Sequence, residues 1–335
     1  MRKRLLAFLL CLIMALSLLP TAVFAANGSA GDVNIAFGDG WRLDAGGCLH
    51  ITGAVHNEPT RKVDNWIYIN KTVWADVKFR ITSVVAEPGS SIDNCESLFS
   101  NCENLVSVDL RYLDTSRVAT MEEMFYNCKS LKSVDLSRLD TSNVTNMKSM
   151  FERCIHLTSV TLRDPAYPDG FNTQYVNNMS NMFEDCYSLP CMDLSSLNLK
   201  SAYYAKEMFL NCHSLYRLDI GNLNGVTDDI VYECLALQEI SGTPNSVNKL
   251  AHNLSDIGKW NLTWYDYPNA RHWENVQTGE VYRTHDELVN SLFYSTAERV
   301  TLRLYNGYLI HFDPCGGNFS DRGIQFSYTT TDGRG

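Results

Sequence analysis

Six cysteines recur at nearly equal intervals through the middle of the chain. They are Cys102, Cys128, Cys154, Cys186, Cys212 and Cys234. Thiols can ligate metal ions, form disulfides or act as nucleophiles, so their spacing decides which chemistry is open to them. Zinc sites use cysteine pairs about two to four residues apart, whereas most of these cysteines lie 26 residues apart and no Cys-x-x-Cys occurs. The spacing therefore disfavours a metal cluster.

Two other roles remain for these thiols. If successive repeats stack, neighbouring cysteine Cα atoms lie about 5 Å apart, which a disulfide tolerates. Side chains of one column point the same way, however, and free cysteine packs well as a small buried apolar group. We expect a column of buried thiols, with one or more disulfides as the alternative. Cys191 takes the place of serines such as Ser133 and Ser159, and alternation along the strand puts it on the exposed face, as a reactive thiol or a tolerated surface cysteine.

Aspartates at the ends of the expected strands are the second set of chemically capable residues. Stacking pairs Asp109 with Asp135 and Asp193 with Asp219, about 5 Å apart. That separation suits a retaining glycosidase, but the expected surface is flat and repeated, with no pocket or aromatic subsite. Calcium takes about 6 to 8 oxygen ligands, and Thr161 interrupts the column. We therefore expect a solvated recognition face here, not a hydrolytic centre or a cation site.

The exposed strand positions and one inserted loop supply the candidate binding residues. The loop, residues 163–171, lengthens one cysteine interval to 32 residues and carries Tyr167 and Phe171. Exposed aromatic side chains are enriched at interfaces, but Phe171 aligns with Leu139 and is expected in the core, which leaves Tyr167. The candidates are Asp109, Arg111, Asp135, Thr161, Arg163, Tyr167, Asp193, Arg217 and Asp219.

Sequence motifs of enzymes are missing from the chain. No nucleophile elbow, P-loop, dinucleotide fingerprint or H-E-x-x-H occurs, and the eight histidines are scattered. We therefore expect a protein that is not an enzyme, with no catalytic residue, no cofactor and no metal ligand.

Each cysteine belongs to a longer repeat. A leucine follows three residues later, at Leu105, Leu131, Leu157, Leu189, Leu215 and Leu237, and an apolar residue precedes by three, at Phe99, Phe125, Phe151, Phe183, Phe209 and Val231. A period of about 20 to 29 residues with L-x-x-V-x-L at its centre is typical of leucine-rich repeats. We predict a right-handed leucine-rich-repeat solenoid, poor in helix, with one short parallel strand per repeat, a β-hairpin cap before it and a small α+β flank after it.

The N-terminus and the charge indicate the compartment. Residues 1–25 combine three basic residues, an apolar run and a small-residue cleavage site, which is typical of a secretory signal peptide. Its removal leaves 25 of the 28 basic residues against 38 acidic ones, a formal charge of −13. Such a chain is a poor candidate for binding nucleic acid. After cleavage no stretch reaches the roughly 18 apolar residues of a membrane-spanning helix, so we expect a secreted protein.

The repeats divide the chain. We expect a signal peptide over 1–25, an N-terminal β cap over 26–80, the solenoid over 81–243, a C-terminal capping segment over 244–300, and the start of a β-grasp-like module over 301–335. The last segment ends without a closing strand or a sorting signal, so we expect the natural polypeptide to continue.

The repeat also resembles a known family. The stretch "MEEMFYNCKSLKSVDLSRLDTSNVTNMKSMFERC" resembles the repeats of BspA-like leucine-rich repeat proteins of bacterial surfaces, M-F-x-x-C-x-x-L-x-x-L-D-L-S-x-F-D-T-S-x-V-T-N-M. The resemblance covers residues 81–242, and "WRLDAGGCLHITG" is similar to the family's entry segment. "FDPCGG" is similar to the F-D-P-N-G-G opening of the Listeria-Bacteroides (internalin-type B) repeat, with Cys315 in place of asparagine and the module cut short.

The resemblance implies a secreted or cell-wall-associated protein of a Gram-positive-type bacterium, acting in adhesion or host contact. Some members bind extracellular-matrix proteins, and the family has no catalytic residues to carry over. We expect non-enzymatic binding of a host or bacterial surface or matrix protein through the solenoid face, with a glycan as a further possible ligand. The alternative is a carbohydrate-recognising or spacer module of a larger cell-wall enzyme whose catalytic part lies outside this chain.

Overall fold

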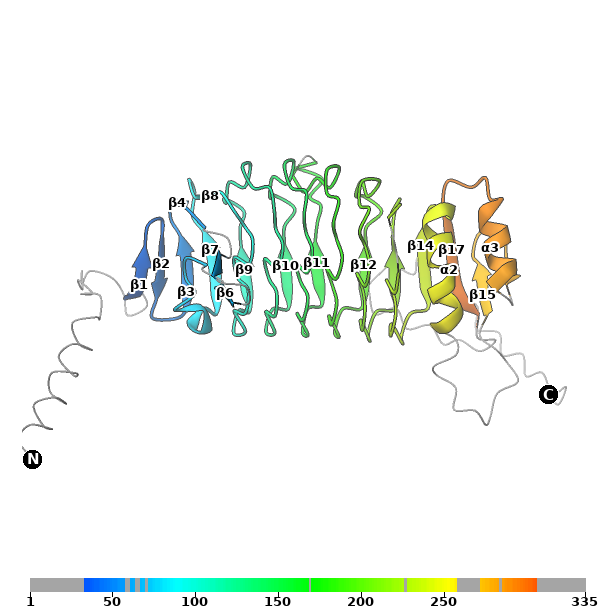
Figure 1. The fold of residues 1–335 in the computed structure, drawn as a ribbon, viewed down its shortest axis with the longest axis horizontal. Helices are drawn as coiled ribbons and strands as arrows, with labels where there is room; N and C mark the ends of the chain where they lie inside the picture. Colours follow the sequence, from blue (N-terminus) through cyan, green and yellow to red (C-terminus); the bar gives the residue numbers. More distant parts are fainter. Residues whose placement is uncertain are drawn as a thin grey trace, which may run out of the picture.

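The computed structural model describes residues 33–57, 61–63, 67–69, 72–168, 170–225, 228–257, 272–282 and 285–305. The predicted signal peptide and all but the first five residues of the predicted β-grasp-like module lie outside these ranges. The described chain consists mostly of short strands with few helices, and none of its sheets closes on itself. Figure 1 shows the strands side by side along the long axis of the molecule. No described helix has the length and apolar character needed to cross a membrane.

The first strands form an antiparallel meander that leads into a parallel row. Strands β1, β2 and β3 pair antiparallel, and β3 then pairs parallel with β7, which pairs parallel with β9. Their bounds are β1 Asn34–Gly38, β2 Trp41–Asp44, β3 Cys48–Ile51, β7 Ser83–Ala86 and β9 Ser107–Asp109. The turn between β2 and β3 needs Gly47, because its φ is +85° and a Cβ there would lie 2.6 Å from Arg80 O.

Smaller elements flank this first sheet. Strands β4 and β8 pair parallel and β5 and β6 antiparallel, and a 3₁₀ turn precedes β7. Their bounds are β4 Ala54–Val55, β5 Arg61–Val63, β6 Ile67–Ile69, the 3₁₀ turn Lys78–Arg80 and β8 Ser91–Ile92.

Each later repeat contributes one three- or four-residue strand. Strands β10 and β11 pair parallel, as do β12, β13 and β14, with same-position residues opposite each other. Their bounds are β10 Ser133–Asp135, β11 Ser159–Thr161, β12 Cys191–Asp193, β13 Arg217–Asp219 and β14 Glu239–Gly242. A second row of parallel bridges joins Thr120 to Asn146, Asn146 to Asn178 and Asn178 to Tyr204. Both rows connect residues one repeat apart, and the strand row is interrupted between β9 and β10 and between β11 and β12, which belong to different sheets.

An aromatic column fills the interior between these rows. Five phenylalanines stack with ring centroids 5.2 to 5.4 Å apart, and all are fully buried. They are Phe99, Phe125, Phe151, Phe183 and Phe209, and buried Val231 takes the equivalent place in the next repeat. Trp74 heads the column, stacked on Phe99 at 5.4 Å, with Trp41 edge-on to it at 6.1 Å. Burying one large apolar side chain contributes about 1.5 to 3 kcal/mol, so this column is a main source of stability.

The tight turn before each cysteine has an unusual backbone. Twelve described non-glycine residues have φ between 52° and 63°, two in each of six repeats. This left-handed region is sparsely populated by residues with a Cβ. Hydrogen bonds to the next repeat hold it: Ser97 N donates to Glu122 O at 2.8 Å and Asn101 N to Tyr126 O at 2.7 Å. The stacking of repeats therefore offsets the local strain.

The C-terminal flank ends the parallel row. Strand β17 lies antiparallel between β14 and β15, and β15 pairs with β16, while helices α2 and α3 lie at this end of the molecule (Figure 1). The bounds are α2 Pro244–Ile257, β15 His272–Asn275, β16 Val281–Tyr282, α3 His285–Phe293 and β17 Val300–Tyr305. The predicted boundary at residue 301 falls inside β17, so residues 300–305 lie in the same sheet as the last repeats.

Candidate functional site

The outward face of the parallel strands carries two rows of side chains. In β10 to β14 the middle residues are buried or half-buried, whereas the first and third residues point to the exposed face. The first row contains Ser133, Ser159, Cys191, Arg217 and Glu239, and the second contains Asp135, Thr161, Asp193, Asp219 and Ser241. Thr161 and Asp135 therefore share one face of the sheet of β10 and β11, and Asp193, Arg217 and Asp219 share one face of the sheet of β12 to β14.

The aspartates on this face also form the turns that end the strands. Each accepts, through Oδ1, the N–H of the residue two positions later, at 2.8 to 3.2 Å. The four are Asp109, Asp135, Asp193 and Asp219. An aspartate that bonds its own backbone in this way is a turn former. The recurrence of aspartate at this position is therefore explained by its role in forming the turn after each strand. A role in recognition would be additional.

The expected carboxylate pairs differ from one another. Asp193 and Asp219 are partners in the register of β12 and β13, whereas Asp109 and Asp135 belong to strands of different sheets. Asp109 is held by Arg111, whose Nε and Nη2 donate to it at 2.9 and 2.7 Å. This contact lowers the pKa of the Asp109 carboxyl. Asp219 pairs with Arg299, which lies next to β17. Two of the four carboxylates therefore have an arginine partner.

The inserted loop presents an ordered aromatic ring. Tyr167 is 47% exposed, and the Arg138 guanidinium lies 4.1 Å from its ring centroid. Arg138 also approaches Asp164 at 3.6 Å, while Arg163 Nη1 donates to Ser196 O at 3.4 Å. Phe171 is buried, as its alignment with Leu139 predicts. We call Tyr167, Arg138 and Arg163 the loop platform; Arg138 was missed because it belongs to the preceding repeat.

The six repeat cysteines are free thiols inside the core. In five repeats the thiol donates to the carbonyl oxygen of the phenylalanine one repeat earlier, at 3.1 to 3.2 Å, as Cys154 does to Phe125. Burial raises the pKa of Cys102 and Cys154 to about 12. A protonated buried thiol is neither a metal ligand nor a nucleophile. Cys191 is the first residue of β12, half-buried and in the first row of the strand face. Its role as a reactive thiol or a tolerated surface cysteine stays a prediction.

An acidic cluster lies on the tight turns, away from the strand face. It consists of Glu152, Glu184, Asp185 and Glu207 from three consecutive repeats. Burial, together with the neighbouring carboxylates, raises the pKa of Glu184, although Asn181 donates to it and opposes the shift. Burial likewise raises the pKa of Glu152. Glu152 and Glu184 each directly follow the phenylalanine of their repeat, but Asp185 and Glu207 occupy other positions, so no single column of the repeat predicts this cluster.

Further aromatic side chains lie outside the predicted set. Tyr187 stacks on His213 of the next repeat, with centroids 5.0 Å apart and rings nearly parallel. Tyr203 and Tyr204, each 60% exposed, lie on or beside the second row of bridges, half a repeat away from the strand face. Tyr187 directly follows the buried Cys186, and this position in the repeat is the signal that would have identified it as exposed.

Comparison with known proteins gives similarities to one family and to solved structures. Residues 93–223 match the model of a family described as "Mycoplasma protein of unknown function, DUF285". No curated protein matches the chain significantly. Among solved structures, a leucine-rich repeat protein from Eubacterium ventriosum is similar at 13% sequence identity, over 60% of this chain and 75% of that one, with a TM-score of 0.22. The family match falls on the repeats from Cys102 to Cys212, so it describes the repetitive part of the chain.

Proposed function

We propose that this chain is a non-enzymatic bacterial surface protein. In this proposal its repeats form a leucine-rich-repeat solenoid, the chain is exported, and its exposed strand face with the loop platform binds a protein of a host or bacterial surface. The observation that carries the proposal is a polar strand face repeated from β10 to β14, with one pre-ordered exposed tyrosine beside it. Stacked arginine and tyrosine are among the side chains enriched at protein interfaces.

The geometry favours an extended partner over a small metabolite. Neighbouring parallel strands lie about 4.8 Å apart. Side chains at the same strand position therefore recur at that interval from one repeat to the next, which suits a partner that contacts several repeats. The paired charges at Asp109 and Arg111, and at Asp219 and Arg299, hold side chains in fixed positions. Pre-organised side chains lose less conformational entropy on binding.

The test is a binding panel of extracellular-matrix proteins and bacterial glycans, probed with the full chain. The variant Tyr167→Ala combined with Arg163→Ala removes two of the three exposed side chains of the loop platform. We expect it to weaken binding of a protein ligand about tenfold or more, the effect of losing an interface hot spot. Tyr203→Ala is the matched control, because this tyrosine is at least as exposed but does not lie on the strand face.

The outcomes separate the possible functions. Protein binding that survives the double variant, and also survives Arg217→Ala and Thr161→Ala on the strand face, would refute the proposed surface. Binding restricted to the glycans would favour the alternative, a carbohydrate-recognising or spacer module of a larger cell-wall enzyme.

A further inference from the structure

The N-terminal meander carries a cluster of three different metal-ligating side chains. Asp44 ends β2, and Cys48 and His50 are the first and third residues of β3. Because alternate residues of a strand share a face, Cys48 and His50 project to the same side. Asp44 Oδ1 accepts the N–H of Cys48 at 2.9 Å, which fixes the aspartate beside them. Within the described residues this is the one group whose carboxylate oxygen, thiol sulfur and ring nitrogen all lie within 4.8 Å of one another.

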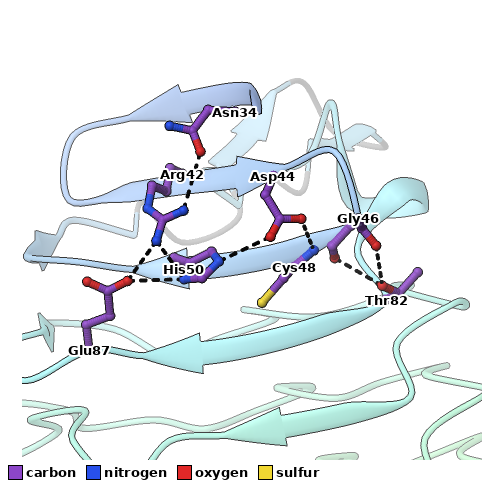
Figure 2. Close-up of polar contacts among 9 residues, drawn as sticks. Asn34, Arg42, Asp44, Gly46, Cys48, His50, Thr82 and Glu87 are labelled. Carbon is purple, nitrogen blue, oxygen red and sulfur yellow. Dashed lines mark hydrogen bonds and ion pairs between the residues drawn. The ribbon is translucent and has the colours of Figure 1, made fainter. Parts of the chain in front are cut away.

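Figure 2 shows how the surrounding side chains orient this cluster. His50 Nε2 lies 3.4 Å from Asp44 Oδ2, and His50 Nδ1 lies 3.1 Å from Glu87 Oε1. Arg42 Nη2 lies 3.0 Å from the same Glu87 oxygen and 3.0 Å from His50 Nδ1. The side chains of Asp44 and His50 are only 15% and 18% exposed. The histidine is therefore held between two carboxylates in a largely dry setting.

The distance between the first two candidate ligands fits a single ion. A tetrahedral Zn²⁺ with bonds of about 2.0 to 2.1 Å to nitrogen and oxygen separates those two atoms by roughly 3.3 Å. Asp44 Oδ2 and His50 Nε2 lie 3.4 Å apart. A neutral histidine that binds an ion through Nε2 carries its proton on Nδ1 and donates it to Glu87 Oε1, 3.1 Å away. Arg42 Nη2, which lies 3.0 Å from both Nδ1 and Glu87 Oε1, then donates to Glu87 alone. A carboxylate in this place is the usual partner of a zinc-binding histidine.

A nucleophilic cysteine is the rival reading of the same three residues. It requires a ring nitrogen directed at the thiol, with the aspartate orienting the other nitrogen. Here Asp44 lies at Nε2, and Glu87 and the Arg42 guanidinium both lie at Nδ1, so both ring nitrogens already have polar partners other than the thiol. The cluster is arranged for sharing an ion, not for proton transfer from sulfur.

We propose that Asp44, Cys48 and His50 form a binding site for a divalent transition-metal ion, with Zn²⁺ as the fitting ion. Two anionic ligands and a neutral imidazole balance the charge of the ion, and Arg42 balances Glu87. Binding requires that the Cys48 thiol release its proton to solvent. Three protein ligands leave the fourth position for water or an external group. The site lies on the same face of its sheet as Ser107 and Asp109 of β9. Cys48 and His50 are in register with Ser83 and Val85 of β7, which are in turn in register with Ser107 and Asp109.

The experiment titrates the metal-free full chain with Zn²⁺ by calorimetry, and with Co²⁺ by absorption spectroscopy under nitrogen. We expect one ion per chain and a cobalt–thiolate charge-transfer band. Cys48→Ser should abolish that band, and His50→Gln should abolish stoichiometric binding. Glu87→Gln should weaken binding about 10- to 100-fold, the usual effect of losing the partner of a ligating histidine.

The controls separate this site from non-specific binding and from misfolding. His213→Gln removes an exposed histidine in a late repeat and should leave the titration unchanged. Circular dichroism checks that each variant is folded, and Asp44→Asn is the second ligand variant because asparagine retains the acceptor for the Cys48 N–H. The absence of stoichiometric binding would overturn the proposal, as would binding that persists in both Cys48→Ser and Asp44→Asn.

Discussion

Replacement of Phe151 by alanine is expected to cost about 3 to 5 kcal/mol of folding free energy. Phe151 is fully buried, and its ring stacks between Phe125 at 5.3 Å and Phe183 at 5.4 Å, nearly parallel to both. The substitution removes the transfer free energy of a ring and leaves a cavity that the neighbouring repeats fill only partly. Two aromatic contacts, each worth about 0.5 to 1.5 kcal/mol beyond buried area, are lost as well.

The position of Phe151 in the middle of the column adds a second expectation. Each repeat of a stacked array contacts only its neighbours, so stability approximates a sum of repeat and interface contributions. A weak central interface should therefore broaden or split the unfolding transition. The same substitution at Phe209 should have a smaller effect on cooperativity, because Phe209 stacks on Phe183 alone within the column.

Urea unfolding followed by tyrosine and tryptophan fluorescence and by circular dichroism measures both effects. Phe37→Ala is the surface control, since Phe37 is 61% exposed, and its change should stay within about 0.5 kcal/mol. A loss below about 1 kcal/mol for Phe151→Ala, well under the range for buried phenylalanines, would refute the view that the aromatic column is a main stabiliser.

Two further expectations follow from the buried and acidic groups. Burial raises the pKa of Cys102 and Cys154 to about 12. Iodoacetamide at pH 8.5 should therefore label the six repeat cysteines only after denaturation, whereas it should label Cys48 in the native chain. Mass spectrometry locates the label, and labelling of the repeat cysteines in the native chain would contradict their burial. Burial raises the pKa of Glu184 above its ordinary value of 4.5, so the folded state binds more protons than the unfolded state between the two pKa values, and stability falls as pH rises through that window. Glu184→Gln should make the free energy of unfolding less dependent on pH and should raise the melting temperature at pH 7. If the stability of this variant depends on pH between 4 and 7 as that of the unaltered chain does, the raised pKa of Glu184 in the acidic cluster is refuted.

Much of the fold could be predicted from the repeat. When equivalent residues lie one above another, a position that is apolar in every repeat must be interior, so Phe99 to Phe209 and the repeat cysteines could be placed in the core from spacing alone. The strand face followed from alternation around Val134 and Leu218. The αL turns at residues such as Asn101 and Arg153 could not be predicted, because their strain is compensated only by bonds to the next repeat.

The candidate site was only partly accessible to the same reasoning. The strand aspartates were predicted to be exposed, but their bonds to their own backbone, as in Asp135 to Ser137 N, depend on local turn geometry. Arg138 was missed beside Tyr167 because a loop insertion breaks the register on which the alignment rested. The cluster of Asp44, Cys48 and His50 was missed because it lies outside the repeats, where no period marks it.

The sequence by itself determined which residues form the interior of the repeats. Because the period is regular, equivalent residues of successive repeats lie above one another, and an apolar residue in every repeat forms a buried column. The tertiary structure alone decided which residue begins the phenylalanine column and which charged side chains pair. Trp74 stacks on the first phenylalanine of the column. Arg299 pairs with Asp219, and Arg303 pairs with Glu239. Such contacts join residues about 25 to 80 positions apart that share no common spacing, so only the folded backbone brings them together. The same holds for Glu87, which meets His50 because two strands separated by 31 residues, β3 and β7, pair in one register.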